Sequence, residues 1–242
     1  MEKRLETILA HAGVASRRKA AILIESGRVT VDGEVVREKG ARFEPSEHQI
    51  SVNDTPIVQE EKKYYFVFNK PADVITTVED THGRKKVSDF FKNVKARLYP
   101  VGRLDKNTTG LLLVTNDGRL AHGLSHPSSE VKKVYHVTMR PDPDKEDIVK
   151  LSTGIIIEGK RTAPCKIEFL GKTRDVVLYS ITLHEGRKRQ IRNMIEAVGS
   201  KVLTLKRVRY GNITLGNLKE GESRALTPEE IKKIDALIKK KN

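Results

Sequence analysis

The chain has 242 residues, a formal net charge of +14 and a single cysteine, Cys165. This length allows one large domain or two smaller ones, each with its own core. One cysteine excludes an internal disulfide and fits a reducing compartment. No uninterrupted apolar run exceeds five residues, whereas a membrane-spanning helix needs roughly twenty. We therefore expect a cytoplasmic protein without a membrane-bound part.

The positive charge is unevenly distributed along the chain. Residues 1–58 contain nine Lys/Arg and nine Asp/Glu, so the whole excess lies in 59–242. Residues 82–106 and 184–210 each hold eight basic and two acidic side chains. Clusters of this kind attract phosphate backbones without reading their sequence. A solvated basic surface that only aids solubility is the alternative.

The first segment predicts two short helices followed by a β-hairpin. Apolar residues over 5–9 recur at helical spacing, and this helix ends near Gly13. Ser16 is placed as an N-cap of a second helix, which Gly27 ends. Asp32-Gly33 then stands between two β-prone runs, which is a strong hairpin signal.

The second of these helices begins with three cations, Arg17, Arg18 and Lys19. Cations are unfavourable beside a helix N-terminus, whose dipole attracts anions. An external anion bound there would account for them; a solvated first turn is the alternative. Together with Ala12-Gly13-Val14-Ala15-Ser16 and Val29-Thr30-Val31-Asp32-Gly33, the segment resembles the small αL-type, S-four-like RNA-binding domain. That resemblance covers about residues 2–50 and implies RNA contacts by Arg17, Arg18, Lys19 and Arg28.

The polar stretch over 59–63 predicts a linker between an S-four-like domain at 1–58 and a second domain at 64–242. In the second domain the strands outnumber the helices and do not alternate regularly with them, which favours an α+β domain with a mixed, mainly antiparallel sheet. The expected strands cover 64–69, 110–115, 134–139, 155–158, 166–170, 176–183 and 202–210. The expected helices cover 144–151, 185–198 and a segment that starts with the capping box Thr227-Pro228-Glu229-Glu230.

One carboxylate, Asp105, stands out in Val101-Gly102-Arg103-Leu104-Asp105-Lys106-Asn107-Thr108-Thr109-Gly110. It lies between an arginine and a turn, just before an apolar strand. Neither a second acid, as a hydrolase dyad needs, nor a recognisable metal-ligand spacing accompanies it. A lone carboxylate in a basic protein suggests a nucleophile aimed at a polyanion. Turn chemistry alone is the alternative, because short polar side chains and glycine favour turns.

Four segments occur in one order along the chain. They are Asn69-Lys70-Pro71, Gly102-Arg103-Leu104-Asp105, Lys133-Val134-Tyr135-His136-Val137 and His184-Glu185-Gly186-Arg187-Lys188-Arg189-Gln190-Ile191-Arg192. With Val202-Leu203-Thr204-Leu205-Lys206-Arg207 near the end, the series resembles the RsuA/RluB-type family of ribosomal RNA pseudouridine synthases. The likeness spans nearly the whole chain. It implies an enzyme that isomerises a uridine in ribosomal RNA without a metal or a cofactor.

The resemblance also implies roles for single residues. Asp105 is the expected nucleophile; it would attack the sugar or the uracil ring, or assist proton loss. Tyr135 would stack on a flipped-out uracil, Arg103 would fill the vacated place in the RNA, and Arg192 would pair with Asp105 and keep it ionised. Otherwise Tyr135 is a core side chain and Arg192 a solvent or phosphate contact. The remaining cations expected at the RNA are Arg187, Lys188, Arg189, Lys206 and Arg207.

The expected partner is ribosomal RNA or a ribosome assembly intermediate, bound by a monomer. Large-subunit RNA is favoured over small-subunit RNA on overall resemblance. A non-catalytic RNA-binding or ribosome-assembly protein is the competing class, and the set of Asp105, Tyr135 and Arg192 counts against it because phosphate binding needs no acid. Nucleic-acid hydrolysis is disfavoured, since the sequence shows no clustered carboxylates for metal ions.

Overall fold

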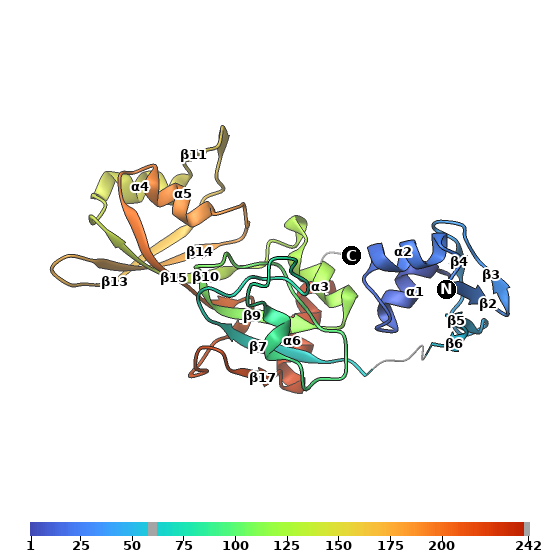
Figure 1. Ribbon diagram of the computed structural model, residues 1–242. Coiled ribbons are helices and arrows are strands. Elements are labelled where there is room, and N and C mark those ends of the chain that lie inside the picture. The colour runs from blue at the N-terminus through green and yellow to red at the C-terminus, as the bar shows by residue number, and fades with distance from the viewer. Residues whose placement is uncertain (58–61, 240–242) are drawn as a thin grey trace. The chain divides into compact units, whose positions relative to one another are not determined.

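The structure is a computed structural model that describes residues 1–57 and 62–239 (Figure 1). It contains two compact units. The N-terminal unit comprises Met1–Tyr64 with two later segments, Asn93–Leu98 and Asn116–Gly118, and the C-terminal unit comprises the rest of the chain. Of the expected linker at 59–63, residues 59–61 lie outside the described residues.

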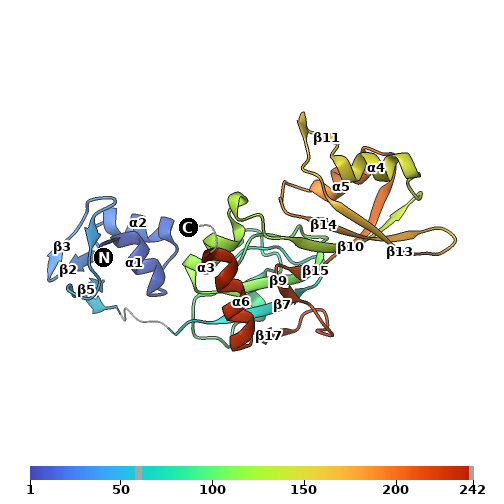
Figure 2. The ribbon, with the colours of Figure 1, turned by 180° about the vertical axis from the view of Figure 1, so that it is seen from behind.

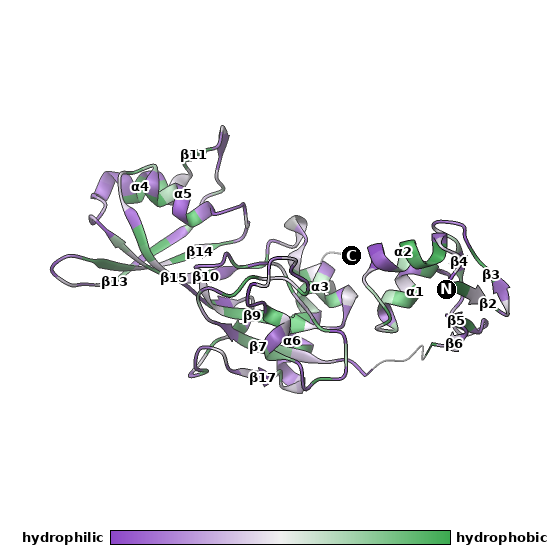
Figure 3. Cartoon of the chain, viewed as in Figure 1, coloured by the Kyte–Doolittle hydropathy of each residue, from purple (hydrophilic) through white to green (hydrophobic). Residues whose placement is uncertain are grey.

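The N-terminal unit packs two helices against short strands. Helices α1 and α2 carry both hydrophobic and hydrophilic residues (Figure 3), and their apolar side chains form one core with those of the strands. The strand order of the sheet is β3-β2-β5-β6, and β1 pairs separately with β4. The elements are β1 (Lys3–Arg4), α1 (Leu5–His11), α2 (Arg17–Glu25), β2 (Val29–Val31), β3 (Glu34–Val35), β4 (Arg42–Phe43), β5 (Ile50–Val52) and β6 (Thr55–Pro56).

Local chemistry explains the boundaries of these elements. The Ser16 hydroxyl accepts a hydrogen bond from the backbone N–H of Lys19 at 3.2 Å, and so caps α2 as expected. Gly27 follows α2 with a φ of +72°. Asp32 and Gly33 both have positive φ, +51° and +88°, which is the geometry of a type I′ turn between paired strands. The expected hairpin is therefore confirmed.

The C-terminal unit is built on a nine-stranded sheet of order β13-β14-β10-β15-β9-β7-β17, with β16 paired to β15 and β8 to β9. All pairs are antiparallel except β9 and β15, which confirms the α+β class with a mixed, mainly antiparallel sheet. The strands are β7 (Tyr65–Lys70), β8 (Tyr99–Pro100), β9 (Thr109–Thr115), β10 (Lys133–Arg140), β13 (Lys166–Lys172), β14 (Val177–Leu183), β15 (Lys201–Tyr210), β16 (Ile213–Thr214) and β17 (Ser223–Ala225).

Each half of this sheet has its own apolar core. Helices α4 and α5 pack on the half formed by β10, β14 and part of β15, and helices α3 and α6 pack on the half formed by β7 and β9 (Figures 1 and 2). Strands β11 and β12 form a separate hairpin. The remaining elements are η1 (Val87–Phe90), α3 (Gly118–Ser125), η2 (Pro127–Ser129), α4 (Lys145–Thr153), β11 (Ile156–Ile157), β12 (Lys160–Arg161), α5 (Gln190–Glu196) and α6 (Pro228–Lys239).

Two expectations about helices were wrong. The helix expected over 185–198 begins only at Gln190, because Arg189 has left-handed backbone angles (φ +51°, ψ +25°) that interrupt a helix. Residues 184–189 therefore form a loop. Helix α3 was not expected at all; its apolar side chains Leu120 and Leu124 are almost fully buried. The capping box before α6 is confirmed, with reciprocal bonds between Thr227 and Glu230 of 2.9 and 3.2 Å.

Candidate active site

A cavity of about 620 Å³ opens in the C-terminal unit beside Asp105. Its wall is formed by the turn that follows β8, the loop before α5 with the first residues of α5, and single residues of β10, β14 and β15. The residues that line it are Arg103, Leu104, Asp105, Thr108, Tyr135, Leu183, Gly186, Arg187, Lys188, Arg189, Gln190, Ile191 and Leu205. The structure therefore brings Asp105, Tyr135 and Arg103 together, as the sequence predicted.

Asp105 lies in a turn, residues 104–108, in which the backbone carbonyls of residues 104–107 all have donors. The Thr76 hydroxyl donates to Leu104 O at 2.6 Å, and Thr108 N–H donates to Asp105 O at 3.0 Å. The Lys70 ammonium donates to Lys106 O at 3.1 Å. Arg192 Nη2 donates to Asn107 O at 3.0 Å. Side chains from three distant parts of the unit thus hold the backbone of Asp105 in place.

The carboxylate of Asp105 is itself uncommitted. Within the described residues it has no hydrogen bond and no ion pair within 4.0 Å, and its side chain is partly exposed at the cavity. A fixed backbone with a free carboxylate is the arrangement that a nucleophile or a base needs, because the group is positioned before the substrate arrives.

Gly110, five residues after Asp105, permits the close approach of two strands. β9 pairs in parallel with β15 at this point, with Gly110 opposite Arg207. A Cβ atom on Gly110 would lie 2.2 Å from the carbonyl oxygen of Arg207, and the φ of Gly110 is +102°. Only glycine fits here, so the end of the turn that carries Asp105 is fixed to β15 by a backbone contact.

Lys70 is a buried cation beneath the turn, and its side chain has 0% exposure. Its ammonium donates to Pro71 O at 2.8 Å as well as to Lys106 O. Burial lowers the pKa of Lys70 to about 8, and the charges of Asp73 and Asp105 oppose that shift. Sequence reasoning noted Lys70 within a motif but gave it no role. The signal for such a role was a lysine at the end of a strand that begins with four apolar residues, Tyr65 to Phe68.

Tyr135 reaches the cavity from β10 just after a β-bulge. Val134 lies opposite Arg209 on β15, but Tyr135 lies opposite Arg207, so that one residue of β15 is extra. Bulges redirect side chains and are frequent next to active sites. Tyr135 is partly buried against the core of β10, β14 and α5. One side of its ring is thus packed while the residue also lines the cavity.

Arg192 does not form the expected ion pair with Asp105. Among the described residues, its guanidinium donates a hydrogen bond to Asn107 O, and its buried Nε has no partner. Burial lowers the pKa of Arg192, the nearby Arg189 adds to that shift, and Asp105 opposes it. The Arg192 guanidinium is therefore close enough to interact electrostatically with the Asp105 carboxylate, but its hydrogen bond goes to the backbone of the turn. The sequence predicted that Arg192 pairs with the carboxylate of Asp105, whereas in the structure it bonds to a backbone carbonyl of the same turn.

The loop 184–189 is held by polar bonds on both sides. The Glu185 carboxylate accepts from Ala163 N–H at 3.0 Å and from the Gln190 side-chain amide. The Arg187 guanidinium donates to the carbonyls of Ile157, Lys160 and Arg161, at 2.7, 3.0 and 3.4 Å. Arg187 was expected to contact phosphate. Its guanidinium is instead engaged with the β11–β12 hairpin.

Arg207 was also expected at the RNA, and this expectation was wrong. Its side chain is only 2% exposed, its Nε donates to Leu111 O at 2.7 Å, and its guanidinium lies 5.0 Å from the centre of the Tyr210 ring. The alternation of β15 turns Arg207 inward. Its neighbour Lys206 is half-buried, opposite His136.

The other predicted cations are at the surface. Arg103, Lys188 and Arg189 are exposed and line the cavity. In the N-terminal unit the three cations at the start of α2 are exposed, and Arg28 is exposed with its Nε bonded to Asn53 at 2.7 Å. In the part of the chain that the structure describes, no cluster of His, Cys, Asp or Glu is arranged to hold a metal ion, and no helix is long and apolar enough to cross a membrane.

The Asp105 carboxylate, free of hydrogen bonds within the described residues, thus lies at a cavity lined with cations, an arrangement suited to chemistry on a polyanionic substrate. Comparison with known families agrees. The family model described as RNA pseudouridylate synthase matches residues 64–197, and the S4 domain matches residues 3–48. The chain belongs to the RNA pseudouridylate synthase family and carries an N-terminal S4 domain. The expected family and the expected enzyme class are thereby confirmed.

Individual relatives resemble the chain over nearly its whole length. It is 46% identical over 237 residues to ribosomal large subunit pseudouridine synthase B of Bacillus subtilis, a match that covers 97% of this chain and 96% of the relative. It is 39% identical to an uncharacterized RNA pseudouridine synthase of Aquifex aeolicus, over 97% and 94% of the two chains. A solved pseudouridylate synthase structure matches with a TM-score of 0.67 and 32% identity, over 96% and 99% of the chains.

Proposed function

We propose that this protein isomerises a specific uridine of large-subunit ribosomal RNA to pseudouridine. The observation that carries the proposal is the free carboxylate of Asp105, on a turn in which the carbonyls of residues 104–107 are all held by hydrogen bonds, at a cavity also lined by Tyr135 and exposed cations. The large-subunit target is supported by the name of the Bacillus subtilis relative. A small-subunit target is the alternative outcome.

The reaction needs little beyond these side chains. The bond between the ribose C1′ and N1 of uracil breaks, the base turns, and a bond from C1′ to C5 forms; C5 loses a proton and N1 gains one. Product and substrate are isomers, so no oxidant or group donor enters. One carboxylate is required whether it bonds to the sugar, bonds to the ring or assists proton loss from the sugar, and Asp105 takes this role.

The other residues at the cavity contact the flipped base and the RNA strand. The uridine must leave the stack before its C1′ is accessible. The ring of Tyr135 stacks on the flipped uracil, and the exposed side chain of Arg103 fills the space left in the RNA. Arg192 acts on Asp105 through the backbone of the turn as well as by its charge. Lys188 and Arg189 bind phosphates next to the cavity.

The cations of the N-terminal unit dock the RNA. Arg17, Arg18, Lys19 and Arg28 lie on one small unit with an exposed helix start. We assign the protein to the cytoplasm, where it acts as a monomer on ribosomal RNA or on a ribosome assembly intermediate. Size-exclusion chromatography with light scattering tests the monomer, and sedimentation of cell extracts tests association with assembly intermediates.

Two measurements test the reaction and its target. The first is tritium release from RNA labelled at uracil C5: wild-type protein should release it, and Asp105→Asn should not, while its RNA affinity stays near wild type. Release by Asp105→Asn at the wild-type rate excludes Asp105 as the reacting group. The second is a carbodiimide-based map of pseudouridine in both ribosomal RNAs from cells with and without the protein. A site missing only from small-subunit RNA would reassign the target.

A further inference from the structure

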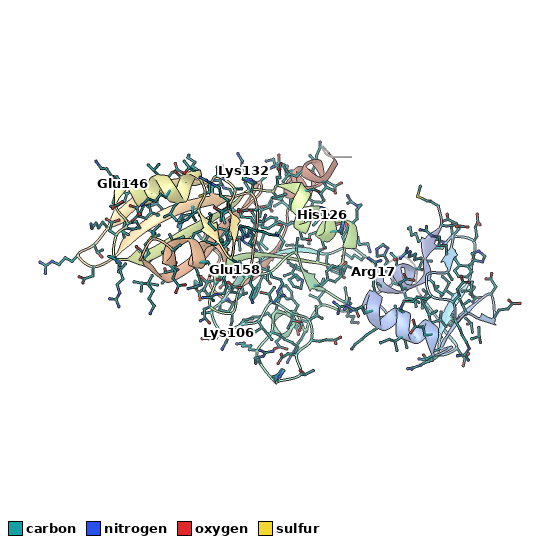
Figure 4. The ribbon with its side chains drawn as sticks, turned by 90° about the horizontal axis from the view of Figure 1, so that it is seen from above. Arg17, Lys106, His126, Lys132, Glu146 and Glu158 are labelled. Carbon is teal, nitrogen blue, oxygen red and sulfur yellow. The ribbon has the colours of Figure 1, made fainter. Side chains whose placement is uncertain are left out.

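The turn that carries Asp105 also contains a hydroxyl that the proposed reaction does not use. Thr108 lies three residues after Asp105, and its backbone N–H donates to Asp105 O at 3.0 Å. Thr108 is only 2% exposed, and it lines the cavity together with Asp105. Lys106, between the two, is 55% exposed, and Figure 4 shows its side chain at the surface of the C-terminal unit. The turn thus directs Lys106 outward and Thr108 inward.

The Thr108 hydroxyl is buried without a hydrogen bond. Its oxygen has no partner among the residues that the structure describes. A buried hydroxyl without a partner destabilises the folded state, because it has lost its bonds to water. Valine has nearly the same shape and avoids this cost, since a methyl group replaces the hydroxyl. Packing alone therefore does not explain a threonine at this position.

The Asp105 carboxylate is the acceptor best suited to this donor. The backbone carbonyls of residues 104–107 already accept hydrogen bonds. The carboxylate accepts none within the described residues, and it lies on the same short turn. In turns, short polar side chains readily bond to groups a few residues away. A hydrogen bond to an ionised acceptor is also about twice as strong as one between neutral groups.

Arg192 brings a second unpaired donor to the same turn. Its Nη2 donates to Asn107 O at 3.0 Å, whereas its buried Nε has no partner in the described part of the chain. Two buried groups that can donate and one carboxylate without a donor are thus gathered at residues 105–108. Most buried polar groups in folded proteins are paired. We therefore interpret this arrangement as one that is completed when the substrate is bound.

We propose that Thr108 is a positioning residue whose hydroxyl donates a hydrogen bond to one oxygen of the Asp105 carboxylate when a uridine occupies the cavity. The bond forms by rotation of side chains, while the backbone of the turn stays in place. It fixes the orientation of the carboxylate and leaves its other oxygen free to react. This holds whether that oxygen bonds to the sugar, bonds to the ring or takes a proton. The inference rests on the proposed function, because it takes Asp105 as the reacting group.

Two variants of Thr108 separate its hydroxyl from its methyl group. Thr108→Val keeps the branched shape and loses the donor. Its single-turnover rate on saturating RNA should fall on the order of 10- to 100-fold, which is the effect of one hydrogen bond to a charged group. Thr108→Ser keeps the donor and loses the methyl group, so its rate should stay within a few-fold of wild type. RNA affinity, measured on proteins that also carry Asp105→Asn, should be unchanged in both.

Urea unfolding of the free protein supplies a readout that does not depend on activity. Thr108→Val should unfold at the same or a higher urea concentration than wild type, because it removes an unpaired hydroxyl. Thr162→Val is the matched control for stability. Thr162 is 3% exposed, and its hydroxyl accepts from Ile155 N–H at 3.0 Å. This variant should unfold at a lower urea concentration, because the N–H of Ile155 loses its acceptor.

Three results would overturn the role of Thr108. They are a wild-type rate for Thr108→Val, a rate for Thr108→Ser as low as that of Thr108→Val, and a loss of stability in Thr108→Val as large as in Thr162→Val. The second would assign the effect to packing, and the third would show that the hydroxyl is already bonded in the free protein. Failure of the proposed function is a separate result, in which wild-type protein forms no pseudouridine in ribosomal RNA.

Discussion

Lys70 is a full positive charge in a site without exposed surface. Such a charge destabilises the folded chain unless it does something that an apolar side chain cannot do. Its two hydrogen bonds hold Pro71 O and Lys106 O, on the two segments that meet under Asp105. We interpret Lys70 as a positioning residue for the turn of Asp105, retained despite its cost in stability.

The lowered pKa of Lys70, about 8, predicts how stability changes with pH. The pKa of an unfolded lysine is about 10.4, so between these values the unfolded chain binds more protons and the folded state gains stability as pH rises. The free energy of unfolding of wild type minus that of Lys70→Met should therefore increase by about 3 kcal/mol from pH 8 to pH 10.5. Urea unfolding across this range measures it.

The comparison with Lys70→Met removes the other groups that titrate there. Burial raises the pKa of Cys165 to about 11 and lowers that of Lys133 to about 8, and both are present in the two proteins. Parallel stability curves for wild type and Lys70→Met would show that Lys70 does not titrate from a buried, charged state.

Arg192 and Arg189 offer a matched pair of arginines at one site. Arg192 Nη2 holds Asn107 O, whereas Arg189 is exposed at the cavity. Arg192→Met should lower the single-turnover rate on saturating RNA, on the order of 100-fold, because a small displacement of a reacting group has effects of this size. Arg189→Met should keep that rate and lower the salt slope of binding by about one unit. A normal rate for Arg192→Met with a reduced slope would make it another phosphate contact.

At the scale of elements, the loop 184–189 and the β11–β12 hairpin depend on each other. The loop contributes Gly186, Lys188 and Arg189 to the cavity, and Arg187 ties it to three carbonyls of the hairpin. Asn193 on α5 also bonds to Glu158 at the hairpin, at 3.3 Å. A short hairpin that contributes no residue to the cavity thus positions one wall of it.

Arg187→Met and Lys188→Met separate this structural role from RNA binding. Arg187→Met removes the side-chain donor to the partly buried carbonyl of Ile157 and should lower the free energy of unfolding by about 1–3 kcal/mol, with no change in the salt slope of RNA binding. Lys188→Met, at the neighbouring exposed position, should leave stability within about 0.5 kcal/mol and lower the slope. Thermal unfolding and salt-dependent binding of both variants test this, and the reverse pattern would contradict it.

Elements defined by local chemistry could be predicted from the sequence. The cap at Ser16, the Asp32-Gly33 turn and the Thr227–Glu230 box all depend on residues within a few positions of each other. Elements defined by distant partners could not. The loop before α5 is held by Ala163 N–H, about twenty residues away in the chain, so the apolar spacing of α5 gave its face correctly but not its start.

The residues of the candidate site also fall into those that could be predicted from the sequence and those that could not. Asp105, Tyr135 and Arg103 could be placed together because the motifs that carry them were read as one series. The basic charge of the sequence did not show which cations form hydrogen bonds within the fold instead of contacting RNA. Arg207 and Arg187 look like phosphate ligands in the sequence, and only the strand pairing and the hairpin show which carbonyls they serve.

At the scale of the whole molecule, each unit has an apolar core of its own. Ten buried residues, among them Leu5, Leu9 and Ile24, form the core of the N-terminal unit, and none of them belongs to the two cores of the C-terminal sheet. The charge follows this division, since residues 1–58 are neutral overall and the excess lies beyond them. Each unit should therefore fold around its own core; the C-terminal unit should carry the reaction, and the N-terminal unit should serve binding through a few exposed cations.

Removal of residues 1–58 tests this division. The remaining chain keeps both cores of the sheet and every residue of the cavity, so we expect a cooperative thermal transition and tritium release from saturating RNA. At sub-saturating ribosomal RNA the efficiency should fall, because the cations at the start of α2 and Arg28 are lost. A full-length chain with Arg17→Met and Arg18→Met is the control and should show part of the same fall without a change at saturation. Unchanged efficiency of the truncated chain on its natural site at low RNA concentration would exclude docking by the N-terminal unit, whereas loss of the thermal transition would show that the sheet does not fold alone.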